Sequence, residues 1–325
     1  MKTIRWGIIG CGDVTEVKSG PGFQKAEHSS LVAVMRRNGE LAADYARRHG
    51  VPRWYDNAEA LIADPEVDAV YVATPPAPHK DYTLMCAAVG KPVYVEKPMA
   101  MNHAECVDMV DACRRAGVPL FVAYYRRALA RFVKIKELID GGAIGAPRFV
   151  NVVYHRPASE SDRDPAQNWR IDPAVAGGGY FLDLASHMLD FLDHALGPIA
   201  HASGQGGNQA GLYKAEDIVT GSFVFESGVQ GSGVWCFDSF GRRDETTIVG
   251  TRGSLRYATF DDSPVLLTTE AGTEEFVIPY PAHVHQPLIQ TIVDQLNGQG
   301  LCPSTGESAA RTSRVMDLLL GDYYR

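Results

Sequence analysis

The 325-residue sequence lacks the features that mark membrane, nucleic-acid-binding and metal-dependent proteins. No apolar run approaches the roughly 20 residues that a membrane-spanning helix needs, and no signal-peptide core follows the first residues. The net charge of −8 disfavours a large nucleic-acid or anionic-membrane surface. The six cysteines are scattered without the paired spacing of a metal site. We therefore expect a cytoplasmic protein that has no metal, no nucleic-acid partner and no membrane partner.

Internal repeats and low-complexity linkers are also absent, and the 45% hydrophobic content is ordinary for a globular protein. At 325 residues the chain is long enough for two domains with sizeable cores. The pattern of apolar residues changes near residue 124. We therefore expect one domain over residues 1–123 and a second over 124–325.

Short apolar runs alternate with helical patterns over residues 1–123, which is the rhythm of a doubly wound parallel sheet of the Rossmann type. Strands are predicted over 4–9, 31–35, 69–73, 92–95 and 119–123. Helices are predicted near 13–27, 40–49, 57–63, 79–89 and 102–116. The first domain is thus predicted to be an α/β domain.

The first predicted strand runs into a glycine pair, Gly10 and Gly12. These match the first two glycines of a dinucleotide fingerprint, which allow a tight turn and a close approach of the pyrophosphate to a helix N-terminus. The third position is Thr15 rather than a smaller residue, so the helix should pack slightly farther from the strand. Because the pair follows a strand inside a βαβ rhythm, we predict a dinucleotide site here.

The end of the second predicted strand bears on the choice of dinucleotide. NAD sites usually place an acidic residue there for the ribose 2′-hydroxyl, whereas NADP sites place an arginine for the 2′-phosphate. Here the chain has Arg36 and Arg37, and no acidic residue. We predict that NADP(H) is preferred and leave NAD(H) open, since the two arginines could also be solvated surface residues.

Short alternating strands dominate the second predicted domain. They are expected over 148–154, 218–225, 229–237, 245–250, 254–257, 265–269 and 274–278. The turns at Ser227-Gly228 and Arg252-Gly253 favour antiparallel pairing. Residues 204–208 are expected to form a flexible loop, and helices are expected near 128–140, 288–296 and 308–320. One sheet face of mixed polarity is available to a second copy, so a homodimer or homotetramer through this sheet is predicted.

Residues able to handle protons and charge stand at two places. Lys97 follows the fourth predicted strand and is held extended by Pro98, and the carboxyl ends of parallel strands are where such folds bind ligands. Asp183 and His187 lie one helical turn apart, after three glycines at 177–179. An Asp–His pair of this kind can also be a purely structural contact, and Lys97 can be a surface lysine.

Three motifs together resemble the glucose–fructose oxidoreductase / inositol dehydrogenase / rhizopine-catabolism (Gfo/Idh/MocA) family. They are Gly10-x-Gly12, Glu96-Lys97-Pro98 and the run from Gly177 to Asp183 and His187. The resemblance spans nearly the whole chain. Thr15 departs from the family's usual small third residue, and the Arg36-Arg37 pair departs from the NAD-using members of the family. It implies a Rossmann domain followed by an α/β domain with a large, open, predominantly antiparallel sheet.

By this resemblance Lys97 contacts the reacting oxygen, His187 exchanges its proton, and Asp183 orients His187 or the substrate. The chemistry agrees, because hydride loss from a carbinol also requires loss of the hydroxyl proton, and histidine is suited to that transfer near neutrality. The predicted catalytic residues are therefore Lys97, Asp183 and His187.

Further residues near the strand ends are candidates for binding. For the dinucleotide they are Gly10, Cys11, Gly12, Asp13, Val14, Arg36, Arg37, Thr74, Pro75, His79, Glu96, Lys97 and Arg127. For the substrate they are Lys97, Tyr125, Tyr154, Trp169, Arg170, Asp183, His187 and His285. Trp169 could instead belong to the core, and Arg170 could pair with Asp172. Aromatic and hydrogen-bonding side chains together suit a carbohydrate or polyol substrate.

The sequence thus predicts an NADP(H)-dependent oxidoreductase acting on a secondary alcohol or ketone of a sugar, polyol or related diol. Two alternatives remain: a non-catalytic dinucleotide-sensing regulator of the same fold, and an NAD-dependent glycosidase.

Overall fold

The computed structural model describes residues 1–164 and 168–324, which form two compact units. The first unit consists of Met1–Leu129 and Pro281–Ala310, and the second of Ala130–Tyr280 with the described residues from Arg311 onward. The division expected at residue 123 treated the domains as contiguous segments, whereas each compact unit is built from two segments. No helix in the described part of the chain is long and apolar enough to cross a membrane.

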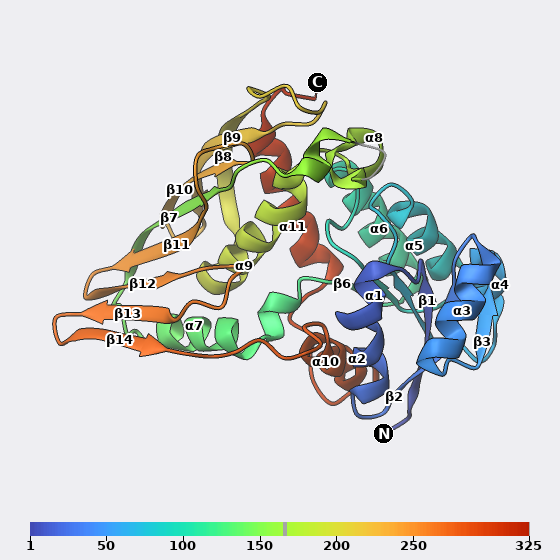
Figure 1. Ribbon diagram of the computed structural model, residues 1–325. Coiled ribbons are helices and arrows are strands. Elements are labelled where there is room, and N and C mark those ends of the chain that lie inside the picture. Colours follow the sequence, from blue (N-terminus) through green and yellow to red (C-terminus); the bar gives the residue numbers. More distant parts are fainter. Residues whose placement is uncertain (165–167, 325) are drawn as a thin grey trace. The chain divides into compact units, whose positions relative to one another are not determined.

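A six-stranded parallel sheet forms the centre of the first unit, in the order β3-β2-β1-β4-β5-β6 (Figure 1). The strands are β1 (Ile4–Ile9), β2 (Ser29–Met35), β3 (Arg53–Tyr55), β4 (Ala69–Val72), β5 (Val93–Val95) and β6 (Leu120–Val122). The helices are α1 (Asp13–Val17), α2 (Gly20–Lys25), α3 (Gly39–His49), α4 (Ala58–Ala63), α5 (His79–Ala88), α6 (His103–Ala116) and α10 (Gln286–Leu296), with a 3₁₀ turn, η1 (Tyr125–Ala128). The predicted Rossmann sheet is confirmed.

Successive strand residues supply two separate hydrophobic layers, because side chains alternate between the faces of a sheet. On one face Ile9 and Met35 pack with residues of α4, α5 and α6. On the other, Trp6 and Ile8 pack with residues of α2, α3 and α10. Helix α10 joins this unit because its apolar stripe, which includes Ile289, belongs to the second layer. A linear division of the sequence does not reveal that packing.

Two local features of the first unit differ from the prediction. The helix expected near 13–27 is broken into α1 and α2, because Pro21 has no N–H to continue the first helix and suits the first turn of a new one. Glycine at position 20 allows the close approach to the Thr15 carbonyl oxygen and the Tyr45 hydroxyl that this break requires. The short edge strand β3 was not predicted, since its three residues are too few for a visible alternation.

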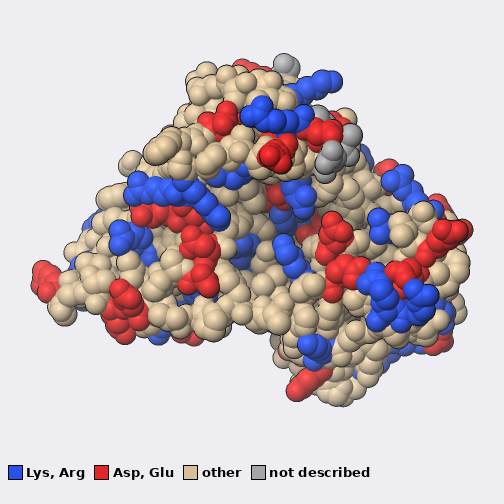
Figure 2. Space-filling model, in the orientation of Figure 1, with Lys and Arg blue, Asp and Glu red and all other residues tan. Residues whose placement is uncertain are grey.

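Charged side chains near α1 and α3 are paired rather than gathered by sign, and Figure 2 shows Lys and Arg beside Asp and Glu over this region. The Arg48 guanidinium lies 2.7 Å from Glu16 and 2.7 Å from Asp44. This part of the surface is therefore not a basic patch.

The second unit has an eight-stranded sheet in the order β14-β13-β12-β11-β7-β10-β9-β8. Its strands are β7 (Pro147–His155), β8 (Ile199–Gly207), β9 (Ile218–Phe225), β10 (Gln230–Cys236), β11 (Arg243–Gly250), β12 (Gly253–Tyr257), β13 (Val265–Thr269) and β14 (Gly272–Phe276). Neighbouring strands are antiparallel except β7 and β10, which are parallel. The predominantly antiparallel sheet is confirmed.

Helices pack on one face of this sheet. They are α7 (Ala130–Asp140), α9 (Ser186–Leu196) and α11 (Gly306–Leu320), while α8 (Pro173–Ala176), the π-helix η4 (Phe181–Ala185) and the 3₁₀ turns η2 (Glu160–Arg163) and η3 (Trp169–Ile171) lie in the segment between β7 and α9. Contact with the sheet is direct, since the Trp235 indole N–H of β10 donates to Met188 Sδ of α9 at 3.2 Å. The opposite face carries exposed Phe149 and Val224 among polar residues such as Asn151 and Ser232.

The flexible loop expected over 204–208 is wrong for Gly204–Gly207, which belong to strand β8 and pair with β9. A side chain on Gly204 would collide with the backbone of Leu319 in α11, and one on Gly221 in β9 would collide with the Leu319 side chain. These glycines therefore permit close packing of α11 on the sheet. Strand β8 was not predicted, because glycines give no alternation of apolar and polar residues.

Candidate active site

The loop after β1 has the geometry that a dinucleotide requires. Gly10 has φ of +90°, a conformation that strongly favours glycine, and its N–H donates to the Met35 carbonyl at 2.9 Å. Gly12 precedes α1, and a side chain there would meet only the Gly10 carbonyl oxygen, at 3.8 Å. The first glycine thus makes the turn, and the second leaves open the space that a pyrophosphate would take at the helix N-terminus.

The Thr15 side chain holds this loop through two hydrogen bonds. Its hydroxyl donates to the Gly12 carbonyl at 2.7 Å and accepts the Gly12 N–H at 3.0 Å. Of the other loop candidates, Cys11 is buried in the core, where burial raises the pKa of its thiol to about 11. Val14 is partly buried against that core, and Asp13 is exposed in the first turn of α1.

Arg36 and Arg37 are exposed where β2 ends, just before α3. Within residues 1–164 and 168–324 neither guanidinium lies within 4 Å of a carboxylate. Asn38 caps α3 with its side-chain oxygen, which accepts the Leu41 N–H at 3.2 Å. Two cations without carboxylate partners beside a helix N-terminus favour an anionic ligand.

The loop that follows β4 meets the loop that follows β5. The His79 imidazole is buried, with Nε2 2.8 Å from the Thr74 carbonyl and Nδ1 3.1 Å from the Pro98 carbonyl. The His79 ring thus lies between the two loops, and burial lowers its pKa. The Thr74 hydroxyl is buried beside Gly10 and has no hydrogen-bond partner among the described residues, and Pro75 is partly buried. The Thr74 hydroxyl is therefore available for a hydrogen bond to a ligand at the carboxyl ends of the strands.

Glu96 is a buried carboxylate that supports Lys97. It accepts the Tyr71 hydroxyl and the Lys97 backbone N–H, the latter at 3.1 Å. Burial raises its pKa. His285 Nε2 lies 3.6 Å from Glu96, and burial lowers the pKa of His285 to about 3, so its ring is neutral. Lys97 itself is partly buried and begins a cis peptide bond to Pro98.

The aromatic and basic candidates of η1 pack close to this carboxylate. The Tyr125 ring lies 4.4 Å from the His285 ring, and the Arg126 guanidinium lies 5.1 Å from the Tyr125 ring centre. Arg127 is buried and donates to the Pro303 carbonyl at 2.9 Å. His285, predicted to bind substrate, lies within the wall that supports Glu96, and its substrate role stays a prediction.

In the second unit the segment with Asp183 and His187 begins as a π-helix and continues as α9. The i, i+4 spacing was predicted for a regular α-helix, whereas single π-turns of this kind are frequent at functional sites. The Arg170 guanidinium lies 3.2 Å from Asp183 and 4.6 Å from the Trp169 ring centre. The alternative partner of Arg170, Asp172, instead caps α8. The structure therefore brings three predicted residues into contact.

His187 and Tyr154 share an aromatic neighbour. The His187 ring is 3% exposed and lies 6.0 Å from the Phe260 ring, edge to face. Tyr154, on β7, lies 5.4 Å from the same ring and is also buried. Phe260 had not been singled out in the sequence, because one phenylalanine in a turn carries no motif.

No pattern in the sequence pointed to a buried carboxylate near the glycine run, Glu216, or to its partner Tyr324. The Glu216 carboxylate accepts the Gly179 N–H, and the Tyr324 hydroxyl donates to the same carboxylate. Glu216 stands far from the glycines in the sequence, so no local pattern connects them. Within the described residues no group of three His, Cys, Asp or Glu side chains could hold a metal ion.

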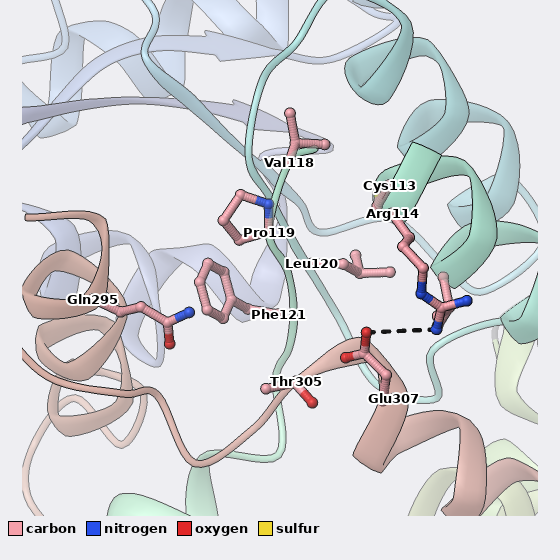
Figure 3. Close-up of a pocket in the computed structure, with 10 residues that line it drawn as sticks. Cys113, Arg114, Val118, Pro119, Leu120, Phe121, Gln295, Thr305 and Glu307 are labelled. Carbon is pink, nitrogen blue, oxygen red and sulfur yellow. Dashed lines mark ion pairs between the residues drawn. The ribbon is translucent and has the colours of Figure 1, made fainter. Parts of the chain in front are cut away.

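A cavity of about 280 Å³ lies elsewhere in the first unit, by the amino end of β6 (Figure 3). Its rim includes Arg114 and Glu307, 3.9 Å apart, and its wall includes Val118, Pro119 and Leu120. Ligands of doubly wound sheets bind at the carboxyl ends of the strands, so this cavity is not the dinucleotide site.

Comparison with known proteins agrees with this geometry. The family model described as "Oxidoreductase family, NAD-binding Rossmann fold" matches residues 4–124, and the Gfo/Idh/MocA C-terminal domain model matches residues 132–256. The chain is 41% identical over 324 residues to oxidoreductase P35 of Formosa agariphila, covering 98% of each chain. It is 32% identical over 316 residues to 1,5-anhydro-D-fructose reductase of Ensifer adhaerens, covering 93% of this chain and 91% of that one.

Among solved structures, aldose–aldose oxidoreductase from Caulobacter crescentus, complexed with glycerol, has the same fold. The TM-score is 0.87 at 24% identity, over 100% of this chain and 99% of that one. The resemblance inferred from the sequence is confirmed: this chain is an oxidoreductase with an NAD-binding Rossmann domain, and it belongs to the Gfo/Idh/MocA family.

Proposed function

We propose that the protein is an NADP(H)-dependent oxidoreductase that moves a hydride between the nicotinamide and a secondary alcohol or ketone of a sugar, polyol or related diol. The observation that carries the proposal is the presence of Lys97, Asp183 and His187 in a chain of this family. The relative named 1,5-anhydro-D-fructose reductase supports a carbohydrate substrate.

Each catalytic residue has a distinct task in this proposal. The nicotinamide supplies the hydride chemistry when it is bound. The Lys97 ammonium contacts the reacting oxygen and stabilises its developing negative charge. His187 takes the hydroxyl proton in oxidation and returns it in reduction, and its burial keeps water from competing for that proton. Asp183, held by Arg170 at 3.2 Å, orients His187 or the substrate.

The dinucleotide would be held by the loop around Gly10 and Gly12 and by the buried Thr74 hydroxyl. Arg36 and Arg37 would bind the 2′-phosphate, which is the basis for the NADP(H) preference. The open sheet face with Phe149 and Val224 would join copies of the chain as a homodimer or homotetramer. The cytoplasmic location stays a prediction.

A steady-state absorbance assay with NADP⁺, NAD⁺ and their reduced forms tests this function against aldoses, ketoses, polyols and aromatic dihydrodiols. We expect turnover of at least one of these substrates, with NADP(H) favoured. Turnover of glycosides without net change of the cofactor would instead indicate the glycosidase. Binding without turnover of either kind would indicate a dinucleotide sensor.

Lys97→Met tests the mechanism. It should lower kcat by at least about 100-fold while NADPH fluorescence still reports binding. Lys91→Met is the matched control, because Lys91 precedes β5 and its ammonium donates to the Asp64 carbonyl at 2.7 Å, away from the carboxyl ends of the strands. Wild-type kcat in Lys97→Met would contradict the assignment.

A further inference from the structure

Glu216 is a buried acid that the proposed reaction does not use. Its side chain is fully buried, and its two carboxylate oxygens lie 2.8 and 2.9 Å from the Gly179 nitrogen, whose N–H they accept. The Tyr324 hydroxyl also donates to this carboxylate. A buried carboxylate is costly unless hydrogen bonds satisfy it, and here the Gly179 N–H and the Tyr324 hydroxyl supply that compensation.

The glycine run is shaped to receive this carboxylate. A side chain on Gly178 would stand 2.7 Å from the Leu182 side chain and 3.3 Å from Glu216 Oε2. One on Gly179 would stand 2.8 Å from the Glu216 carbonyl oxygen, 2.9 Å from the Ala215 side chain and 3.1 Å from Glu216 Oε1. Neither residue has a positive φ, so the backbone shape itself does not demand glycine. Close approach of Glu216 is therefore the main physical reason for Gly179, whereas at Gly178 the Leu182 side chain is the nearer obstacle.

The same peptide leads directly to the predicted catalytic pair. The Gly179 carbonyl accepts the Asp183 N–H at 3.4 Å, and η4 and α9 continue from there through His187. Gly179 thus joins Glu216, through its N–H, to the first turn that holds Asp183. A shift of the carboxylate would move the start of this turn, and reacting groups tolerate only small displacements.

We propose that Glu216 is a positioning residue for the oxidoreductase reaction: its buried carboxylate fixes the backbone at Gly179 and so sets the places of Asp183 and His187. The inference rests on the proposed function, because it assigns that pair a role in catalysis. Tyr324 completes the arrangement by donating to the same carboxylate.

Glu216→Gln tests the inference, and Asp217→Asn is the matched control. Asp217 is also buried, at 3% exposed, and its carboxylate accepts the N–H groups of Gln209 and Ala210 at 2.8 and 2.7 Å, but that segment carries no predicted site residue. We expect Glu216→Gln to lower kcat by about 10- to 100-fold with the dissociation constant of NADPH unchanged, and Asp217→Asn to keep kcat within about 2-fold. Equal losses of kcat in the two variants, in proportion to their losses of Tm, would overturn the proposal.

Hydrogen exchange separates failure of this inference from failure of the proposed function. In Glu216→Gln the amides from Phe181 to His187 should exchange about 10-fold faster than in the wild type, and in Asp217→Asn they should not. Unchanged exchange would overturn the proposal even if the enzyme turns over, whereas faster exchange supports it even if the reaction proves to be another one. Should Glu216→Gln fail to fold, Tyr324→Phe removes a single donor, and wild-type kcat and exchange there would overturn the proposal.

Discussion

Two buried glutamates, one in each compact unit, hold the backbone next to predicted catalytic residues. Glu96 accepts the N–H of its own neighbour, Lys97, together with the Tyr71 hydroxyl. Glu216 accepts the N–H of Gly179, which is 37 positions away in the chain, together with the Tyr324 hydroxyl. Burial raises the pKa of both carboxyl groups.

The difference lies in sequence distance. Glu96 and Lys97 are adjacent, so a short motif displays both the support and the supported residue. Glu216 is distant in the sequence from the residues that it contacts. Near Asp183 the sequence shows only the glycines that make room for it. A local motif can therefore lack half of its own supporting structure when that half comes from a distant segment of the chain.

A pair of glycine substitutions should give the largest effects. Gly179→Ala should lower the free energy of unfolding by about 1 to 3 kcal/mol, because its methyl group would stand 2.8 Å from the Glu216 carbonyl oxygen. Gly12→Ala has open space, so its stability should match the wild type while NADPH binding weakens by roughly 100-fold. Urea unfolding and fluorescence titration measure the two effects. Reversed results would contradict the assigned roles of these glycines.

The stability of the protein should report the titration of Glu216. Burial raises its pKa from 4.5 to about 7, so the folded state binds the proton more tightly than the unfolded state. The stability from this group is complete below pH 4.5 and is lost as the pH rises toward 7. Relative to Glu216→Gln, the wild type should lose about 2 to 3 kcal/mol of unfolding free energy over this range.

Urea unfolding of both proteins at several pH values measures this difference. The nearby phenols of Tyr213, Tyr323 and Tyr324 have raised pKa values and stay neutral throughout, so they do not contribute. Parallel pH profiles for the two proteins would mean that folding leaves the pKa of Glu216 unchanged.

Arg36 and Arg37, at the exposed end of β2, differ from the two glutamates. Their proposed role depends on their charge and not on hydrogen bonds to a buried backbone. The variant with both Arg36→Ala and Arg37→Ala should weaken NADPH binding by about 10-fold, with NADH binding and Tm unchanged. Fluorescence titration in low and high salt measures this effect. An equal loss for NADH would assign the arginines a role other than binding the 2′-phosphate.

The smallest expected effects come from the two tyrosines that donate to the glutamates. Tyr71→Phe and Tyr324→Phe each remove one hydroxyl donor, and each should lower kcat by about 3- to 10-fold, or ~1 kcal/mol. Steady-state kinetics at saturating substrate measures both. A loss in only one variant would show that the two carboxylates do not support catalysis in the same way.

Much of the fold could be predicted because burial imposes a pattern on the sequence. Strands β1 and β9 have the predicted bounds, since their apolar residues mark the buried layers. Strands β3 and β8 escaped prediction, one being only three residues long and the other rich in glycine. The π-turn at Phe181–Ala185 has no periodicity of its own that a sequence could display.

The site shows the same limit. Gly10, Gly12 and Lys97 were recognisable because backbone conformation and strand position constrain them locally. The ion pair of Arg170 with Asp183, the ring contact of His187 with Phe260 and the carboxylate of Glu216 depend on packing between distant segments. Spacing along the chain does not encode such contacts.

The discontinuous first unit has a consequence for how the chain matures during translation. The sheet face that carries Trp6 and Ile8 is covered in part by Leu288, Ile289 and Ile292 of α10. This helix leaves the ribosome only after the entire eight-stranded sheet has been synthesised. A nascent nucleotide-binding half therefore exposes an apolar surface for most of its synthesis, and a fragment ending at residue 129 would be expected to bind chaperones or aggregate.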